Sequence, residues 1–276
     1  IFFWACFEQA GASLTLFADQ QVDREINVHI SRFVIAGAGA VLIYFLGKAF
    51  GWFFEWSKKT ILSIQGIGAI AIVAMAFAGS IPDIHLSEFP SPWFQSINPL
   101  AIIVLAPFFT MMWGKLAKVN MEPSSPLKMA MGLGLVALGY VIIAYAVSGI
   151  DPSTKIAMFW LFALYIVHTM GELCLSPIGL SMVSKLAPLR LSSLMMGTWF
   201  LANAVANKFA GTLSALIPPG AGEEPAEAGA AIPSFLGIEI SNLFIFFCVF
   251  IVLSGVASLI LLALYRKLLK MMHGVN

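Results

Sequence analysis

Charged residues are scarce in this sequence, and their scarcity argues against a soluble globular domain. Only 11% of the 276 residues are Asp, Glu, Lys or Arg, whereas 60% are hydrophobic. A typical soluble domain carries about 25% charged residues. The net charge is +1, so the chain also lacks the strongly basic character typical of nucleic-acid binding. We therefore expect the lipid bilayer to be its main solvent, and we expect no nucleic-acid partner.

Cysteine is also rare, which argues against both a disulfide framework and a cysteine metal site. The three cysteines, Cys6, Cys174 and Cys248, lie in apolar segments, and their spacing is not that of metal ligands. A free cysteine is usually buried and behaves as a small apolar residue. We expect free thiols that serve packing, no metal site and no cofactor.

Long uncharged runs, by contrast, are abundant. A helix needs about 20 apolar residues to cross a hydrocarbon core of about 30 Å. Eight runs of roughly that length are bounded by charge or by Pro and Gly. The predicted spans are roughly residues 1–18, 33–54, 61–80, 92–114, 128–148, 156–182, 191–217 and 240–265. The chain starts without Met inside an apolar run, and we expect it to be a fragment.

The charged loops between the spans predict their orientation. Cytoplasmic loops next to spans are rich in Lys and Arg. One alternating set of loops, together with the C-terminal tail, carries ten basic residues, and the opposite set carries three. We expect a cytoplasmic C-terminus and external loops at 81–91 and 218–239. The second of these loops is of low complexity, and we expect it to be flexible.

Two carboxylates lie at membrane depth, where an ionisable group costs about 2.5–3.5 kcal/mol. They are Glu8 and Glu172, each far from the ends of its predicted span. A carboxyl group shielded from water can take up and release a proton near neutral pH, as proton-coupled transport requires. Helical spacing places polar or small residues on the same face as each carboxylate. These stripes are Trp4, Glu8, Gly11 and Thr15, and His168, Glu172, Ser176 and Gly179.

Each of these residues also has a purely structural interpretation. Either glutamate could be paired permanently with a basic group on another helix. His168 is a possible proton relay to Glu172, but a packed, hydrogen-bonded histidine is the favoured interpretation. The span at 191–217 repeats the pattern with Trp199 and Asn203, although Trp199, like Trp4, could be an ordinary core aromatic.

Five segments resemble, in the same order, signatures of the proton-dependent oligopeptide transporters of the major facilitator superfamily. They cover residues 1–20 and about 92–215. The segments are FWACFEQAGASLTLFAD, WFQSINPLAIIVLAPFF, SSPLKMAMGLGLVALGY, GELCLSPIGLSMVSKLAP and MMGTWFLANAVANKFAG.

The resemblance implies a twelve-helix symporter that works by alternating access, of which this chain is the C-terminal bundle. Its partner would be the N-terminal bundle of the same transporter, and its substrates would be small peptides. Glu8 corresponds to a glutamate of the seventh helix that pairs with an arginine of the first helix and takes part in proton coupling. Glu172 and Asn98 match residues near the amino terminus of the peptide. Pocket-lining positions are matched by Trp4, Ser176, Trp199 and Asn203.

One departure from the family pattern lies between the seventh and eighth family helices. Two extra spans stand there, and we expect them to form a peripheral helix pair. The predicted fold is therefore an all-α membrane protein with a six-helix bundle and an inserted two-helix hairpin, eight spans in all. Its parts are 1–20 (first span of the bundle), 33–80 (inserted pair), 92–265 (five further spans) and 266–276 (cytoplasmic tail).

The leading hypothesis is proton-coupled symport of di- and tripeptides, with protons as the coupling ion, at the inner membrane of a bacterium. Transport of another small anion or zwitterion, such as nitrate or a modified amino acid, remains open. An intramembrane enzyme that takes its nucleophile and base from Ser176, His168 and Glu172 is a remote alternative. It is remote because the outer helices offer no further catalytic group. We expect a protein that is not an enzyme.

Overall fold

A computed structural model describes residues 1–151, 154–218 and 233–272. The chain divides into two compact units. One consists of Ile1–Arg24 and Pro90–Asn276, the other of Glu25–Phe89. We call them the bundle unit and the inserted unit. The expectation of a flexible loop at 218–239 falls mostly outside the described residues.

The bundle unit is built from long helices joined by short connections. After the first segment its helices are α5 (Ile97–Lys118), α6 (Ser125–Val147), α7 (Met158–Leu186), α8 (Ser192–Ser214) and α9 (Leu243–Met271). Single 3₁₀ turns, η2 (Ser91–Ser96) and η3 (Leu189–Leu191), precede α5 and α8. Its short strands are β1 (Val22–Asp23), parallel to β4 (Ile156–Ala157), and β5 (Ser234–Phe235), antiparallel to β6 (Ile238–Glu239).

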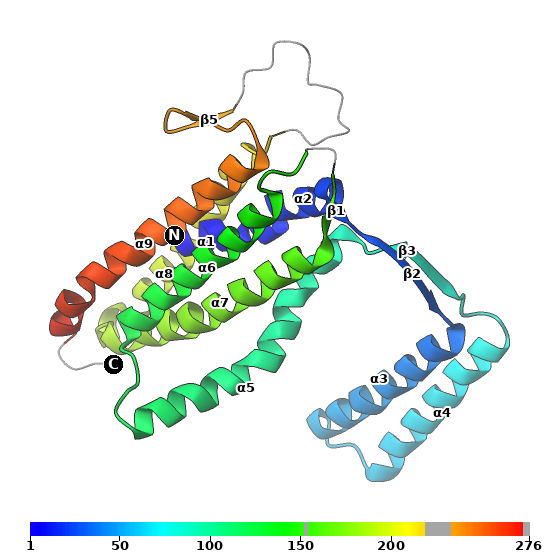
Figure 1. Cartoon of the computed structure of the whole chain (residues 1–276). Helices are drawn as coiled ribbons and strands as arrows, with labels where there is room; N and C mark the ends of the chain where they lie inside the picture. The colour runs from blue at the N-terminus through cyan, green and yellow to red at the C-terminus, as the bar shows by residue number, and fades with distance from the viewer. Residues whose placement is uncertain (152–153, 219–232, 273–276) are drawn as a thin grey trace. The chain divides into compact units, whose positions relative to one another are not determined.

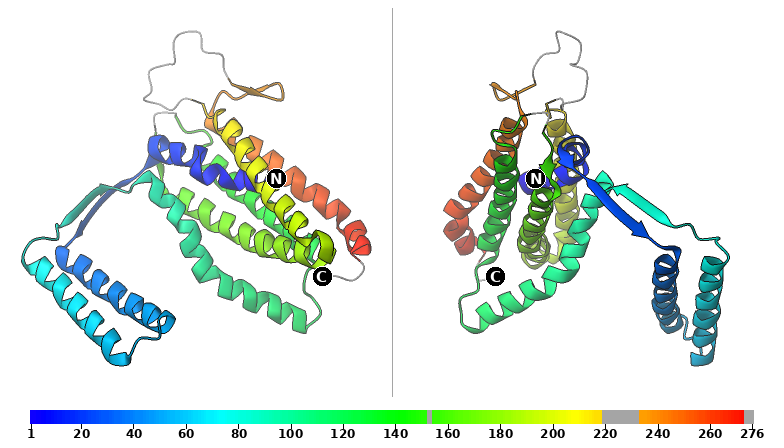
Figure 2. Two further views of the ribbon diagram at one scale, coloured as in Figure 1. Left: turned by 180° about the vertical axis from the view of Figure 1, so that it is seen from behind. Right: turned by 45° about the vertical axis from the view of Figure 1, so that its right-hand side comes forward.

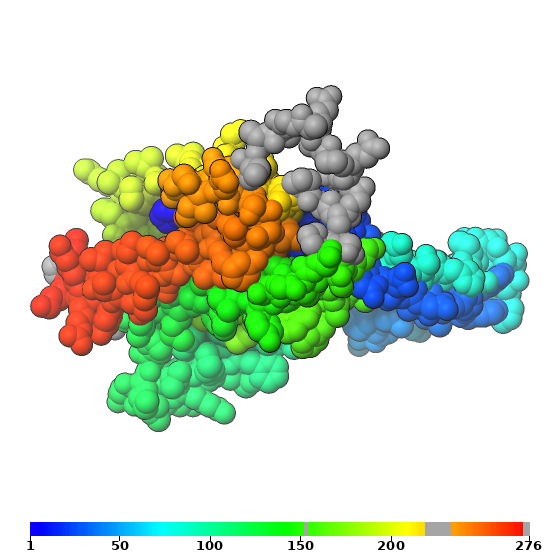
Figure 3. Space-filling model, turned by 45° about the horizontal axis from the view of Figure 1, so that its top comes forward, coloured from blue at the N-terminus to red at the C-terminus, as the bar shows by residue number. Residues whose placement is uncertain are grey.

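Helix α6 forms the centre of this unit, with α7 on one side and α9 on the other (Figures 1 and 2). The space-filling view shows α9, orange to red, lying along α6, in green (Figure 3). A helix that is apolar on all sides has to be shielded from water, either by other helices or by lipid. In α6 the large side chains of Tyr140 and Ile143 are fully buried. Small residues such as Gly132 allow α7 to approach its backbone closely.

The first segment is not the continuous helix that the spacing of Trp4, Glu8, Gly11 and Thr15 predicts. Helix α1 (Phe2–Phe7) gives way to the 3₁₀ turn η1 (Glu8–Gly11), and α2 (Ser13–Gln21) begins after it. Ala12 lies between them with φ −124° and ψ −103°, outside the helical region. The predicted stripe is wrong to that extent, because the period of 3.6 residues ends at Glu8.

The inserted unit is a helical hairpin joined to a strand pair. Helix α3 (Arg32–Phe53) packs against α4 (Lys58–Phe77), and β2 (Glu25–Ile30) pairs antiparallel with β3 (Ile84–Glu88). Gly47 and Gly51 face Gln65 and Ile61 of α4, so these glycines do make a close helix contact. The residues of this strand pair lie between the predicted spans, where the sequence predicts loops.

The fold class predicted from the sequence is confirmed. In the described part of the chain six helices are long and apolar enough to cross a membrane, namely α3, α4, α5 with η2, α6, α7 and α9. The other two predicted spans are the broken first segment and α8. Helix α8 is long enough to span a bilayer, but it carries Asn203, Asn207 and Lys208 and is therefore more polar.

Candidate functional site

A cavity of about 300 Å³ lies where the broken first segment meets η2, α5 and α7. It contains both carboxylates that the sequence places at membrane depth, Glu8 and Glu172. Asn98, from the first turn of α5, lines it as well, together with Gln95 and Tyr165. Of the predicted site residues, the structure thus brings Glu8, Asn98 and Glu172 to one place.

Asn98 holds one oxygen of the Glu172 carboxylate. Its Nδ2 donates to Glu172 Oε2 at 2.8 Å and to Thr169 Oγ1 at 3.1 Å. Thr169 donates in turn to the backbone carbonyl of Tyr165 at 2.8 Å. A hydrogen bond to a charged group contributes about 1.5–3 kcal/mol. These bonds fix the carboxylate against both α5 and α7, so its orientation is set before any ligand arrives.

The Glu8 carboxylate faces the same cavity without such support. Within residues 1–151, 154–218 and 233–272 the structure records no hydrogen bond or ion pair to it. Glu8 does interact electrostatically with Glu172, so the two acidic groups repel each other when both are charged. This arrangement favours binding of a cation or a proton in the cavity.

The break in the first segment exposes backbone carbonyls that the helix would otherwise pair, and side chains satisfy them. Tyr140 donates from its hydroxyl to the carbonyl of Cys6 at 2.6 Å. Tyr165 donates to the carbonyl of Ala10 at 3.2 Å. Non-helical backbone at membrane depth is tolerated only where protein or a water-filled cavity provides such partners. The turn carrying Glu8 is therefore held in place by α6 and α7.

Gln9, beside Glu8, is the fully buried polar anchor of this turn. Its Nε2 donates to the carbonyls of Ala5 at 3.1 Å and Ala210 at 3.0 Å, and its Oε1 accepts from Ser13 Oγ at 2.6 Å. All of the hydrogen-bonding capacity of the amide group except one lone pair is used. Gln9 thereby fixes the Glu8 turn to α8.

His168 lines the cavity but is only 2% exposed. Its Nε2 lies 3.2 Å from the carbonyl oxygen of Val136, and its ring packs against Tyr140 with the centroids 4.9 Å apart. The ring also fills the space beside Gly139, where a Cβ would collide with it. This is the geometry of a packed, hydrogen-bonded histidine, and a relay role stays a prediction.

Four predicted substrate-binding residues lie elsewhere or only at the edge. Trp199 and Asn203 line a separate, mostly apolar cavity of about 320 Å³ between α1, α6, α8 and α9. Trp4 lines both cavities. Ser176 is half-buried on α7 and does not line the cavity of Glu172. His168 and Ser176 thus do not meet there, which disfavours the nucleophile and base of the remote enzyme alternative.

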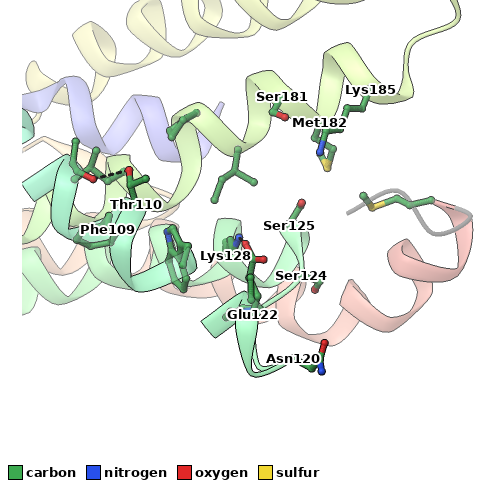
Figure 4. A pocket seen from close by; sticks show the side chains of 18 residues that line it. Phe109, Thr110, Asn120, Glu122, Ser124, Ser125, Lys128, Ser181, Met182 and Lys185 are labelled. Atoms are coloured by element: carbon green, nitrogen blue, oxygen red, sulfur yellow. Dashed lines mark hydrogen bonds and ion pairs between the residues drawn. The ribbon is translucent and has the colours of Figure 1, made fainter. Parts of the chain in front are cut away.

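A larger cavity of about 850 Å³ lies between the C-terminal ends of α5 and α7 and the N-terminus of α6 (Figure 4). The buried Lys128 donates to Glu122 at 2.5 Å, and its Nζ lies 4.9 Å from the ring centroid of Trp113. Lys185 and Met272 line the same cavity. Loops and tail that the charge pattern assigns to the cytoplasm therefore meet at one end of the bundle unit.

The connection between α6 and α7 and residues that flank the predicted external loop at 218–239 meet at the other end of α6. A cavity of about 430 Å³ there is lined by Val147 to Asp151, by Pro218 and by Ser241 to Phe244, among others. The segregation of the two loop sets is what a bundle of membrane-crossing helices requires. Which end faces the cytoplasm stays a prediction.

Sequence reasoning missed three polar residues of the site, Thr169, Tyr165 and Gln95. Thr169 and Tyr165 precede Glu172 by three and seven positions, so they share its helix face. Gln95 precedes Asn98 by three positions and donates from Nε2 to Thr15 Oγ1 at 3.1 Å. The same helical count from Glu172 would have found the first two.

Comparison with known proteins gives consistent relatives. The family model described as the POT family matches residues 39–223. A peptide transporter of Yersinia enterocolitica is 42% identical over 128 residues, which cover 46% of this chain and 25% of that protein. An uncharacterized transporter of Bacillus subtilis is 32% identical over 194 residues, which cover 70% of this chain and 35% of that protein. A di-/tripeptide transporter of Lactococcus lactis is 33% identical over 165 residues, which cover 60% of this chain and 32% of that protein.

Solved structures agree in fold with this chain. A mutant of the peptide transporter POT in complex with alafosfalin matches with a TM-score of 0.64 and 28% identity, covering 99% of this chain and 39% of that one. A POT family transporter in complex with 5-aminolevulinic acid matches with a TM-score of 0.62 and 27% identity, covering 96% and 39%. The chain thus spans between 25% and 35% of the length of the three curated relatives named above.

Proposed function

The chain belongs to the POT family, and on that basis we propose that it is the C-terminal half of a symporter that carries di- and tripeptides together with protons by alternating access. The N-terminal bundle of the same transporter would supply the other wall of the pathway. The peptide substrates of the Yersinia and Lactococcus relatives support this choice of substrate class. Protons act as the coupling ion, and no cofactor is needed.

The observation that carries the proposal is the shared cavity of Glu8, Asn98 and Glu172. A peptide is a zwitterion with an ammonium group at its amino end. Asn98 occupies Glu172 Oε2, and an ammonium group can approach the other carboxylate oxygen. Glu172 would thus bind the amino end of the substrate, while basic residues of the N-terminal bundle bind its carboxylate. The structural neighbour solved with 5-aminolevulinic acid, which also has an amino group and a carboxylate, fits this pattern.

Proton coupling follows from the contrast between the two carboxylates. Glu172 is held by Asn98, whereas Glu8 lies on a short turn between two helices. Protonation of Glu8 removes its repulsion with Glu172 and frees it from a cationic partner in the N-terminal bundle. Such a change in charge at a discontinuous helix can bias the equilibrium between inward-open and outward-open states.

The remaining predictions complete the proposal. The C-terminus faces the cytoplasm of a bacterium, the protein lies in the inner membrane, and the inserted unit has no role in the chemistry. The bacterial origin of the relatives supports this location. Trp4 already lines the cavity of Glu8 and Glu172, whereas Ser176, Trp199 and Asn203 would reach substrate only when the second bundle closes the pathway.

The test is uptake of labelled dialanine by the full-length protein in proteoliposomes with an imposed pH gradient. We expect Glu172→Gln to lower uptake by at least about tenfold, since the loss of one charged hydrogen bond is about 1.5–3 kcal/mol. Glu239→Gln, an exposed carboxylate on β6, is the matched control and should transport normally. Wild-type rates in Glu172→Gln would refute the role. If the wild-type protein does not take up dialanine but does accumulate nitrate, the alternative substrate class is the correct one.

Glu8→Gln separates coupling from binding. Exchange of labelled for unlabelled dialanine at equal concentrations should survive better than accumulation driven by the pH gradient, because only the second process requires a proton to be released. An equal loss of exchange and accumulation would count against a coupling role for Glu8.

A further inference from the structure

Two histidines lie directly opposite each other on the strand pair of the inserted unit. His29 of β2 and His85 of β3 are partners in the antiparallel register, and their ring centroids are 4.4 Å apart at an interplanar angle of 49°. Both side chains are exposed. Neither residue belongs to the proposed transport site, because that site lies in the bundle unit.

We propose that His29 and His85 form a binding site for a divalent transition-metal ion that prefers imidazole, namely Zn²⁺, Cu²⁺ or Ni²⁺. Imidazole nitrogen suits these three ions, whereas Mg²⁺ and Ca²⁺ prefer oxygen. Directly opposite residues of an antiparallel pair present their side chains on the same face of the sheet. Both rings can therefore turn one nitrogen towards a common point.

The ring separation fits this geometry. With a metal to nitrogen distance of about 2.0–2.1 Å, two imidazoles in neighbouring coordination positions place their ring centroids about 4.5–5.2 Å apart. The observed 4.4 Å needs only a small rotation of the side chains. The backbone does not have to move, because the strand register already sets the spacing of the two rings.

The Asp83 carboxylate lies near enough to His29 to interact with it electrostatically, but it is already paired with Arg32 through Nη2 at 2.5 Å and Nε at 3.2 Å, so we do not count it as a metal ligand. In the described part of the chain no three His, Cys, Asp or Glu side chains are arranged around one point. The site therefore offers two protein ligands, and water completes the coordination of the metal.

A bound metal would tie together the two strands that lead into α3 and out of α4. Anything that binds the folded state and not the unfolded state stabilises the fold. The metal would thus close the strand end of the inserted unit, opposite the turn at Phe54 to Ser57. The binding site and its stabilising effect do not depend on transport.

The experiment uses the purified chain in detergent, prepared without a polyhistidine tag, and Cu²⁺ or Zn²⁺ alone as the probe. Electron paramagnetic resonance of bound Cu²⁺ should show coupling to two imidazole nitrogens at one equivalent. Zn²⁺ should raise the unfolding temperature of the wild type. His29→Asn and His85→Asn should each weaken binding by about a hundredfold, which is the usual gain from holding two ligands together.

The matched control exchanges two neighbours, His85→Leu with Leu86→His. It keeps the number of histidines but moves the second ring to the other face of β3. His168 is buried, and the remaining histidine, His273, lies outside the described residues and is retained in every variant. The exchange should weaken Cu²⁺ binding as much as His85→Asn does. Binding as tight as that of the wild type, or coupling to a single imidazole in the wild type, would overturn the proposal.

Discussion

Gly132 of α6 and Gly171 of α7 lie in close backbone contact next to the proposed site, and this contact gives a sharp prediction. A Cβ placed on Gly132 would lie 2.7 Å from the backbone oxygen of Gly171, and one on Gly171 would lie 2.8 Å from that of Gly132. Gly171 directly precedes Glu172. Gly132→Ala should therefore force apart the two helices at the level of the site.

The size of the effect follows from what surrounds the new methyl group. The nearest atom belongs to a backbone and cannot rotate away, so α6 and α7 must separate by a few tenths of an ångström. Adding a methyl group to a well-packed core costs about 1–3 kcal/mol. Replacing Gly by Ala inside a helix returns about 0.5–1 kcal/mol. The difference of these ranges is about 0–2.5 kcal/mol. Because the obstructing atom belongs to a backbone, we expect a net loss of about 1–2 kcal/mol, which corresponds to a fall in unfolding temperature of about 2–8 °C.

The assay is thermal unfolding of the purified chain in detergent, followed by circular dichroism. Gly114→Ala is the matched control: Gly114 lies inside α5, and nothing is within 4 Å of its Cβ position, so only the helix gain remains. The double variant Gly132→Ala with Gly171→Ala should lose less than the sum of the single losses, since both methyl groups separate the same helices. Equal unfolding temperatures for Gly132→Ala and Gly114→Ala would refute the close approach.

Two further predictions concern polar groups. Gln9→Leu removes the acceptor of the buried Ser13 hydroxyl and the side-chain link to the carbonyl of Ala210, and it should lower the free energy of unfolding by about 1–3 kcal/mol. The exposed Gln95→Leu should change it by less than about 0.5 kcal/mol in the same denaturation assay, and equal effects would contradict the anchor role. Hydrogen bonds from Arg32 lower the pKa of Asp83 from 3.8 to about 2. Because the pKa is lower in the folded state, the stabilisation is complete above about pH 5 and is lost as the pH falls through the folded-state pKa of about 2. The difference in unfolding temperature between wild type and Asp83→Asn should shrink over that range, and a constant difference would argue against the pairing.

The spans and the two carboxylates could be predicted because the bilayer imposes simple requirements. Its thickness fixes the length of an apolar helix, and α3, α4 and α6 lie close to the predicted ranges. An ionisable group at membrane depth is rare enough to mark Glu8 and Glu172 without any structure. Asn98 could be placed beside Glu172 only through the family resemblance, since 74 residues separate them.

The break at Glu8 and the strand pair β2–β3 could not be predicted, because their partners are distant in sequence. The carbonyl of Cys6 is paired by Tyr140, which lies 134 residues away, so the local sequence still reads as a helix. Strand pairing likewise depends on register, and Glu25 to Val28 contains an irregularity that shifts it. Local periodicity carries no information on either contact.

The Glu8 carboxylate, for which the described residues provide no hydrogen-bond or ion-pair partner, bears on the proposed coupling mechanism. In the described part of the chain, the neighbouring polar side chains Gln9, Asn98 and Tyr140 all have hydrogen-bond partners. A charged carboxylate without a partner is costly away from water, and Glu172 adds repulsion. A Glu8 carboxylate that faces the cavity beside these satisfied neighbours is consistent with the proposal that a cation or a proton binds there. Under that proposal, the second bundle would present a basic side chain in one state and withdraw it in the other.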